Sequence, residues 1–128
     1  MAKGDDLLER LISFGVAMLE LSAALPKSMA GRHMSDQPMR SATACAPNYA
    51  EPRNGESLGD FVHKLGVVRK ELNESLVWLR MLNQSGNGNS ERLGALLKEC
   101  AEPCKIISAS KKTAGCRLKA RQIGQDEL

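Results

Sequence analysis

The sequence predicts an all-α fold, an antiparallel up-down four-helix bundle formed by a single domain. Its 128 residues include only two Phe, one Tyr and one Trp, so the core must be aliphatic. Leu-, Ala- and Met-rich segments favour helix over strand. Apolar residues recur every three or four positions along four segments, and nowhere with the period of two that is typical of strands. Because the connections between these segments are short, successive helices should pack as antiparallel neighbours.

The first helix is expected over residues 5–25. Asp5 is a suitable N-cap, and Pro26 and Gly31 indicate the loop that follows the helix. Six apolar residues at spacings of three and four should form its buried face: Leu7, Leu11, Phe14, Met18, Leu21 and Leu25.

The second helix is expected over residues 35–51. Ser35 is the expected N-cap, and Pro38 then falls in the first turn, where its missing N–H costs nothing. Pro47 should kink the helix, and Pro52 should end it.

The third helix is expected over residues 58–84 and carries the longest apolar stripe. Ser57 with Asp60 three residues later resembles a capping box, and Gly86 is a C-terminal stop signal. The stripe has heptad-like spacing and consists of Leu58, Phe61, Leu65, Val68, Leu72, Leu76 or Ser75, Leu79 and Leu82.

The fourth helix is expected over residues 91–112, with Ser90 as N-cap and a bend at Pro103. Residues 113–128 carry no apolar stripe, so we expect a bundle domain of residues 1–112 followed by a basic, frayed tail. The buried face of this helix should consist of Leu93, Leu97, Cys100, Cys104 and Ile107.

Catalytic and metal-binding motifs are not evident. His33 and His63 lie on different segments, and no glycine-rich phosphate loop follows a strand, so we expect neither enzymatic activity nor a cofactor. Cys100 and Cys104 are one helical turn apart and could be combined with His63 as metal ligands. That spacing does not match zinc sites, and no fourth ligand suggests itself. Buried free cysteine behaves as a small apolar residue, so we interpret the thiols as structural.

The N-terminal charges and the cysteines indicate a cytoplasmic protein. Asp5, Asp6 and Glu9 stand where a secretory signal would need a cationic region and then an apolar one. The uncharged run over residues 11–19 is too short to cross a bilayer. Four cysteines without such a signal are expected to be free thiols in a reducing compartment.

Four polar residues on the second and third helices form a candidate seam inside the bundle. Glu71 and Glu74 share one side of the third helix, close to its apolar stripe. If Arg40 and Asn48 face them, a charge-paired seam results, which would set the helix register more than it adds stability. The alternative is a set of exposed ion pairs worth under about 1 kcal/mol each.

Basic charge is concentrated near the C-terminus. The formal net charge is only +3, yet residues 105–121 contain six basic residues and no acidic one. Such a tract is a candidate surface for nucleic acid or another acidic partner, and the alternative is a solvated tail. The candidate nucleic-acid-binding residues are Lys105, Lys111, Lys112, Arg117, Lys119 and Arg121.

Two stretches make the chain resemble a bacterial four-helix bundle family. They read LPKSMAGRHMSDQPMRSATACAPNYAEP and DFVHKLGVVRKELNESLVWLRML. The founding members of that family are encoded in intervening sequences of 23S ribosomal RNA genes, and the resemblance covers about residues 7–107. Its most specific positions are Gln37, Arg40, Ser41, Asn48, Ala50 and Glu51 on the second helix, and Phe61, Lys64, Leu65, Glu71, Glu74, Trp78 and Leu79 on the third.

The resemblance implies an up-down bundle that assembles into a homo-oligomer, typically a pentameric ring or barrel. It also implies a relation to the accessory protein of diversity-generating retroelements, which assists a reverse transcriptase and contacts nucleic acid through basic surfaces. No catalytic residues are carried over from the family.

Two functions are therefore expected. The first is a non-catalytic, self-assembling bundle that binds RNA or DNA, or a nucleoprotein partner such as a reverse transcriptase, through basic surface. The second is a protein–protein interaction scaffold with no nucleic-acid role. Neither function involves a membrane or a small-molecule substrate.

Overall fold

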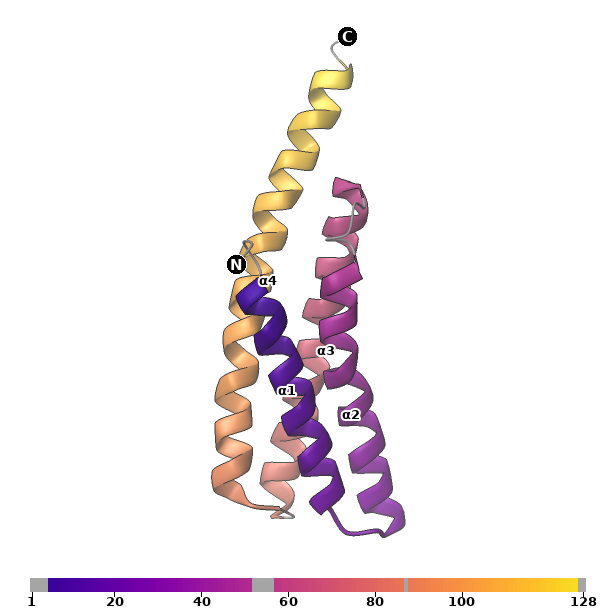
Figure 1. Cartoon of the computed structure of the whole chain (residues 1–128), viewed down its shortest axis with the longest axis vertical. Coiled ribbons are helices and arrows are strands. Elements are labelled where there is room, and N and C mark those ends of the chain that lie inside the picture. Colours follow the sequence, from indigo (N-terminus) through magenta and orange to yellow (C-terminus); the bar gives the residue numbers. More distant parts are fainter. Residues whose placement is uncertain (1–4, 52–56, 87, 127–128) are drawn as a thin grey trace.

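The fold is a bundle of four helices that run up and down side by side (Figure 1). The computed structural model describes residues 5–51, 57–86 and 88–126. Within these ranges it contains no strand, which confirms the all-α prediction. The helices are α1 (Asp5–Ala24), α2 (Met29–Ala50), α3 (Leu58–Ser85) and α4 (Ser90–Asp126).

Each helix packs mainly against its neighbours in the chain, and the interface between α1 and α4 is the least extensive. Two ion pairs join these two helices. Arg10 donates from Nε to Oε1 of Glu99 at 2.6 Å and from Nη2 to Oε2 at 3.3 Å, and Arg92 lies 3.3 Å from Glu20. Charge pairing thus supplements apolar packing where the bundle closes.

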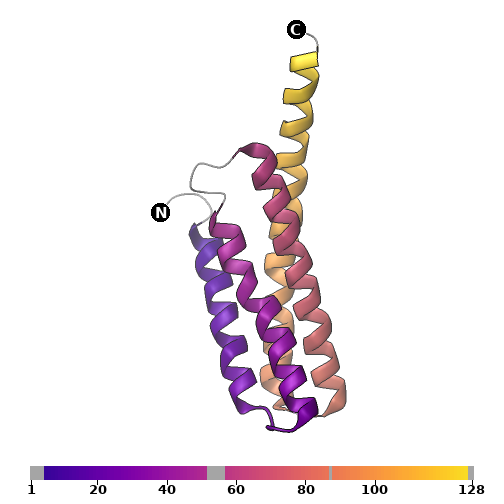
Figure 2. The same cartoon turned by 90° about the vertical axis from the view of Figure 1, so that its right-hand side faces the viewer.

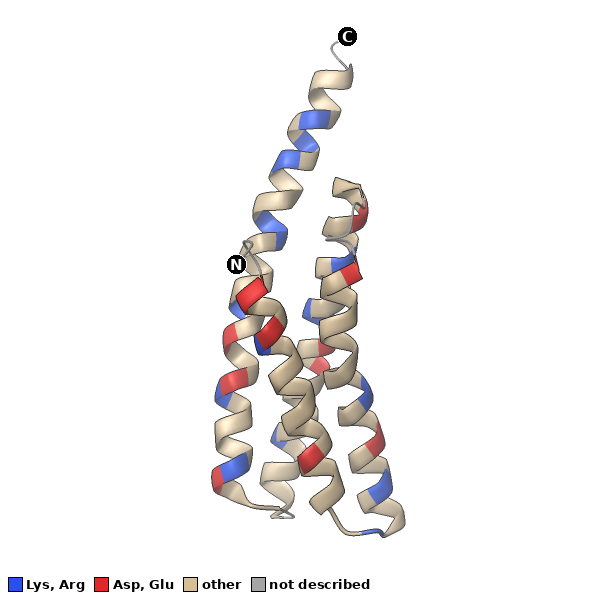
Figure 3. Cartoon of the chain, in the orientation of Figure 1, with Lys and Arg blue, Asp and Glu red and all other residues tan. Residues whose placement is uncertain are grey.

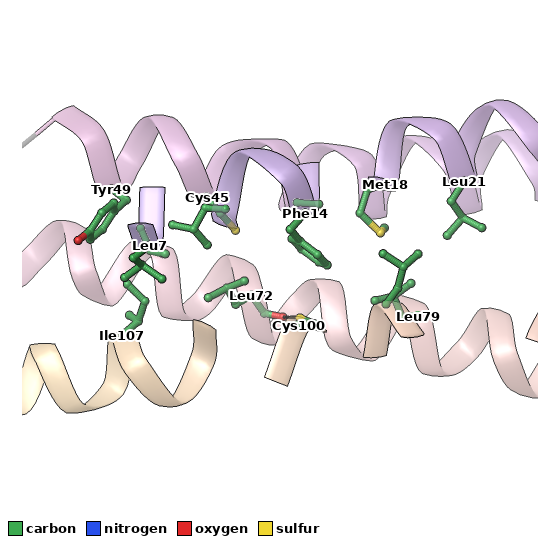
Figure 4. Close-up of a cluster of buried hydrophobic side chains, with 14 of the residues drawn as sticks. Leu7, Phe14, Met18, Leu21, Cys45, Tyr49, Leu72, Leu79, Cys100 and Ile107 are labelled. Atoms are coloured by element: carbon green, nitrogen blue, oxygen red, sulfur yellow. Dashed lines mark hydrogen bonds between the residues drawn. The ribbon is translucent and has the colours of Figure 1, made fainter. Parts of the chain in front are cut away.

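The core is mainly aliphatic, as the composition predicts, and all four helices contribute to it. Figure 4 shows a cluster of these buried side chains. All six apolar residues expected on the buried face of α1 are buried. On α3 the alternative between Leu76 and Ser75 is resolved, because Ser75 is fully buried and Leu76 only partly so. The Ser75 hydroxyl donates to the carbonyl of Glu71 at 2.8 Å, so the buried hydroxyl is satisfied within its own helix.

Helix α2 begins six residues earlier than predicted, so the expectation of Ser35 as N-cap is wrong. Ser28 is the N-cap, and its hydroxyl accepts from the Gly31 N–H at 3.0 Å. Gly31 marks a close approach of two backbones, because an added Cβ would overlap the carbonyl oxygen of Pro26. Pro38 therefore lies inside the helix, where it is buried, and not in the first turn.

Ser35 has a different role, as a contact between α1 and α2. Its hydroxyl donates to the Ser22 carbonyl at 3.2 Å, and the Ser22 hydroxyl donates to the Ser35 carbonyl at 3.4 Å. Pro52, which was expected to end the second helix, lies outside the described residues, and the kink expected at Pro47 stays a prediction.

The ends of α3 agree with the sequence signals. Ser57 accepts from the Asp60 N–H at 3.1 Å, as the capping pattern predicts. Gly86 ends the helix with φ of 73°, a left-handed conformation that favours glycine. The next helix is capped by Asn89 and not by Ser90, because the Asn89 Oδ1 atom accepts from the Arg92 N–H at 3.1 Å.

Helix α4 continues to Asp126, so the prediction of a frayed tail from residue 113 is wrong for the described part of the tail. Eight of the fourteen residues over 113–126 are Ala, Arg, Lys, Leu or Gln, which have good helix propensity, and no proline follows Pro103. Propensity therefore favours helix without an apolar stripe, although two glycines oppose it. Ala114 is still buried. The C-terminal end of α4 extends beyond the other helices (Figures 1 and 2).

None of the helices, taken over the described ranges, is both long and apolar enough to cross a membrane.

Candidate nucleic-acid interface

The packing of α3 against α4 brings part of the basic tract onto the bundle. The two helices run antiparallel, and two thiols on α4 fix their register. Cys100 Sγ donates to the Leu72 carbonyl at 3.3 Å, and Cys104 Sγ lies 3.4 Å from Asn73 Oδ1. Further along the pair, residues preceding Leu72 on α3 lie beside residues following Cys104 on α4.

A groove of about 400 Å³ lies along this part of the pair, and we call it the α3–α4 groove. Eight of the described residues line it; four of these are cationic, and none of the eight is acidic, amide-bearing or aromatic. We call Arg69, Lys111, Lys112 and Lys119 the groove cations. The described lining consists of Val62, Arg69, Ser108, Lys111, Lys112, Gly115, Cys116 and Lys119.

The groove cations carry positive charge that nearby carboxylates do not neutralise. Other cations of the bundle are paired: Lys64 lies 3.2 Å from Glu51, and Lys105 lies 3.6 Å from Glu102. Within residues 5–51, 57–86 and 88–126, no groove cation has a carboxylate oxygen within 4 Å. The groove therefore holds a local excess of positive charge between two packed helices.

Gly66 on α3 explains how one of these cations approaches the neighbouring helix. A Cβ added to Gly66 would lie 3.0 Å from Lys111 Nζ and 3.5 Å from its Cε atom. The ammonium group therefore lies over the α3 backbone, where a larger side chain would displace it.

The structure separates the six basic residues that the sequence singled out. Three of them, Lys111, Lys112 and Lys119, line the groove. Lys105 is paired with Glu102 within its own helix, and Arg117 and Arg121 are exposed but do not line the groove. Basic residues also mark the projecting part of α4 (Figure 3).

Arg69 is the groove cation that the sequence reasoning missed. It is the only one contributed by α3, about forty residues before the basic tract. The signal that could have found it is the antiparallel pairing of α3 with α4, which places this exposed cation of α3 beside the basic part of α4.

The structure places no ion pair between Arg40 and Glu71 or Glu74 among the described residues, and other polar contacts join α2 to α3. Arg40 is exposed and lines a hollow on the α1 side of α2, and no ion pair involves it among the described residues. Its neighbour Ser41 is buried instead and donates to Glu74 Oε2 at 3.2 Å. One step along a helix rotates a side chain by about 100°, which turns Arg40 away when Ser41 points inward.

Asn48 faces α3 as predicted, but its partner is Lys64 and not a glutamate. Lys64 Nζ donates to Asn48 Oδ1 at 3.4 Å, and Asn48 Nδ2 donates to the Ala44 carbonyl at 2.8 Å. These polar contacts between α2 and α3 are thus hydrogen bonds that each join one charged and one uncharged side chain, and they position α2 against α3.

Burial raises the pKa of Glu71 above its ordinary value, and the negative charge of Glu74 raises it further. Lys70 and the hydroxyl of Ser41 partly offset this rise. The Glu71 carboxylate is therefore held in its charged form at a cost to the folded state, because both burial and a like charge disfavour ionisation.

The Glu71→Gln variant is expected to be more stable than the parent protein near neutral pH and no more stable at acidic pH. The folded protein binds the Glu71 proton more tightly than the unfolded chain does. The contribution of Glu71 to the free energy of unfolding is therefore most favourable below the ordinary pKa, and it is lost as pH rises through the raised pKa. Urea unfolding of both proteins at pH 4 and pH 7 measures the difference. Glu9→Gln removes the same charge from an exposed position and reports the effect of net charge alone. A Glu71→Gln effect that does not change with pH would contradict the assignment.

The thiols are free, and the two most buried are unreactive in their surroundings. Burial raises the pKa of Cys45, and it raises the pKa of Cys100 to about 12, so both remain protonated at neutral pH. In the part of the chain that the structure describes, no cluster of His, Cys, Asp and Glu side chains could hold a metal ion.

Comparison with known proteins identifies one family. Residues 6–109 match the family model described as 23S rRNA-intervening sequence protein. A crystal structure of a protein of unknown function from the S23 ribosomal protein family of Bacteroides thetaiotaomicron has a similar fold, with a TM-score of 0.77 and 26% sequence identity. The alignment covers 83% of this chain and 98% of that chain. No curated protein matches the sequence.

Proposed function

Because the chain belongs to the 23S rRNA-intervening sequence protein family, whose name places it with ribosomal RNA genes, we propose that it is a non-catalytic, self-assembling bundle that binds nucleic acid. The observation that carries this proposal is the α3–α4 groove, whose four cations have no carboxylate oxygen within 4 Å among the described residues.

Unpaired cations in a groove are suited to phosphate groups. Each lysine or arginine that neutralises a phosphate releases condensed counterions, and this release supplies most of the affinity of sequence-independent binding. Lysine binds phosphate as a point charge and needs no fixed geometry. Three lysines and one arginine along two packed helices can therefore contact several phosphates at once.

An exposed apolar stripe on α1 supports the self-assembly part of the proposal. Ile12, Val16 and Leu19 follow one another at spacings of four and three, and their exposed fractions are 41%, 48% and 46%. Exposed apolar side chains grouped on one helix face are typical of interaction surfaces.

A homopentamer is the stoichiometry that the family resemblance implies, and light scattering should give five times the chain mass of 13.9 kDa. A mass of one chain would contradict self-assembly.

Nucleic-acid binding is expected to weaken steeply with salt. If the four groove cations each neutralise one phosphate, the slope of log K against log salt should be about −3.6 on B-form DNA. Affinity should then fall roughly 100-fold between 50 and 200 mM salt. Fluorescence anisotropy with a labelled 20-base-pair duplex measures this slope. Absence of binding at 50 mM salt, or binding that salt does not weaken, would overturn the proposal.

Failure of that experiment would favour the scaffold function, in which the exposed apolar stripe contacts another protein. A reverse transcriptase as partner stays a prediction, since no feature of the described residues bears on it.

A further inference from the structure

We infer that the α3–α4 groove binds double-stranded nucleic acid along its phosphate backbone, in preference to single strands. This inference rests on the proposed nucleic-acid function and specifies its ligand. It follows from what surrounds the groove cations, and from the charge density and stiffness of a duplex.

The first argument is that the groove offers no surface on which bases can stack. Proteins that bind single strands combine a basic groove with aromatic side chains, and each stacked base adds affinity. Here Phe14 and Tyr49 are buried, and Phe61 packs against the core. Trp78 meets the His33 ring edge-on, with ring centroids 5.7 Å apart, where α3 faces α2. None of the four aromatic residues lines the groove.

The second argument is that the groove offers little with which to read bases. Adenine is read by bidentate contacts from Asn or Gln, and cytosine is read by Asp or Glu. None of these four residue types is among the described lining residues, whose polar groups are an arginine, lysines, a serine and a thiol. Contacts of this kind position a backbone without selecting a sequence.

The third argument compares the two ligands as electrostatic partners. A duplex has a higher charge density than a single strand. Each neutralised phosphate therefore releases more counterions from a duplex, about 0.9, than from a single strand, about 0.7. A duplex is also stiff over the length of the groove, whereas a flexible strand must lose conformational entropy to align with a row of cations. Lys112 and Lys119 are two helical turns apart on α4, roughly 10 Å along the axis. Cations repeated along a helix in this way suit a ligand whose phosphates are already ordered.

Anisotropy titrations at 50 mM salt test the inference with 20-nucleotide probes: duplex RNA, duplex DNA, each separate strand, and a duplex of scrambled sequence. Duplex RNA and duplex DNA share the phosphate chemistry, and comparing them shows which is the better ligand. We expect at least one duplex to bind about tenfold tighter than its strands, and the scrambled duplex to bind equally well. Single strands that bind as tightly as duplexes would overturn the inference and leave the nucleic-acid function standing. Absence of binding to every probe would overturn both.

A pair of variants tests the stacking argument itself. Gly115 lies in the groove and Gly94 lies elsewhere on α4, and an added Cβ meets no atom within 4 Å at either position. Gly115→Trp should therefore fold normally, which circular dichroism checks, and it should tighten single-strand binding about tenfold by adding a stacking surface. Gly94→Trp is the matched control and should not change it. Unchanged single-strand affinity in folded Gly115→Trp would overturn the argument.

Discussion

The Phe14→Ala variant is expected to lose about 3–5 kcal/mol of unfolding free energy, because it removes a large side chain from a packed core. Phe14 is 1% exposed and lies on the buried face of α1 among side chains from the other helices (Figure 4). Neighbouring helices can close only part of the cavity that the ring leaves, so both transfer free energy and packing are lost. Such a loss is a large fraction of the stability of a domain of this size.

Urea unfolding followed by circular dichroism measures this loss, at one fixed protein concentration because self-assembly would add concentration dependence. Ser13→Ala is the control, since Ser13 is the preceding residue and is exposed. The control should stay within about 0.5 kcal/mol of the parent. If both variants lost similar amounts, or Phe14→Ala lost less than about 1 kcal/mol, the assignment of the core face of α1 would be wrong.

Most of the fold could be predicted because the apolar spacing and the caps agree with the tertiary structure. The buried faces of α1 and α3 follow directly from spacings of three and four. The Ser57 cap and the Gly86 stop were also readable, because each is a local signal. Local signals fail when a tertiary contact decides, as at Ser35, which was expected to cap the second helix and instead exchanges hydrogen bonds with Ser22 on α1.

The C-terminal end of α4 shows a different limit. The absence of an apolar stripe after residue 112 correctly indicates that this segment contributes little to the core, but it does not indicate the absence of a helix. Residues with high helix propensity extend a helix that packing has already nucleated, since propagation needs no new nucleus.

The candidate site could be predicted only in part. Charge counting found Lys111, Lys112 and Lys119, but it could not separate them from Lys105, which is paired with a glutamate one turn away. Charge counting along the chain could not find Arg69, because its place in the groove depends on how α3 pairs with α4. The seam shows the same difficulty, since Arg40 and Ser41 are adjacent in sequence and only packing decides which of them faces α3.

Neutralising the four groove cations is expected to weaken duplex binding about 100-fold or more at 50 mM salt. The variant carries Arg69→Gln, Lys111→Gln, Lys112→Gln and Lys119→Gln, which removes four phosphate contacts and their counterion release. The fold should persist, because three of the four side chains are on an exposed helix and glutamine has good helix propensity. Circular dichroism and light scattering confirm that the variant has the same fold and assembly as the parent protein.

A second variant separates the position of the charges from their number. It carries four glutamines at exposed cations outside the groove, so its formal net charge falls by the same amount. These positions are Lys27, Arg32, Arg80 and Lys98. Long-range attraction is screened over about 10 Å at 0.1 M salt, so this variant should bind within about fivefold of the parent.

The most direct test of the central claim is the duplex affinity of these two variants, measured side by side by anisotropy in the same buffer. If the α3–α4 groove is the nucleic-acid site, the groove variant loses about 100-fold while the control variant keeps nearly all of its affinity. Equal weakening of the two variants would show that binding depends on net charge alone and would contradict the claim.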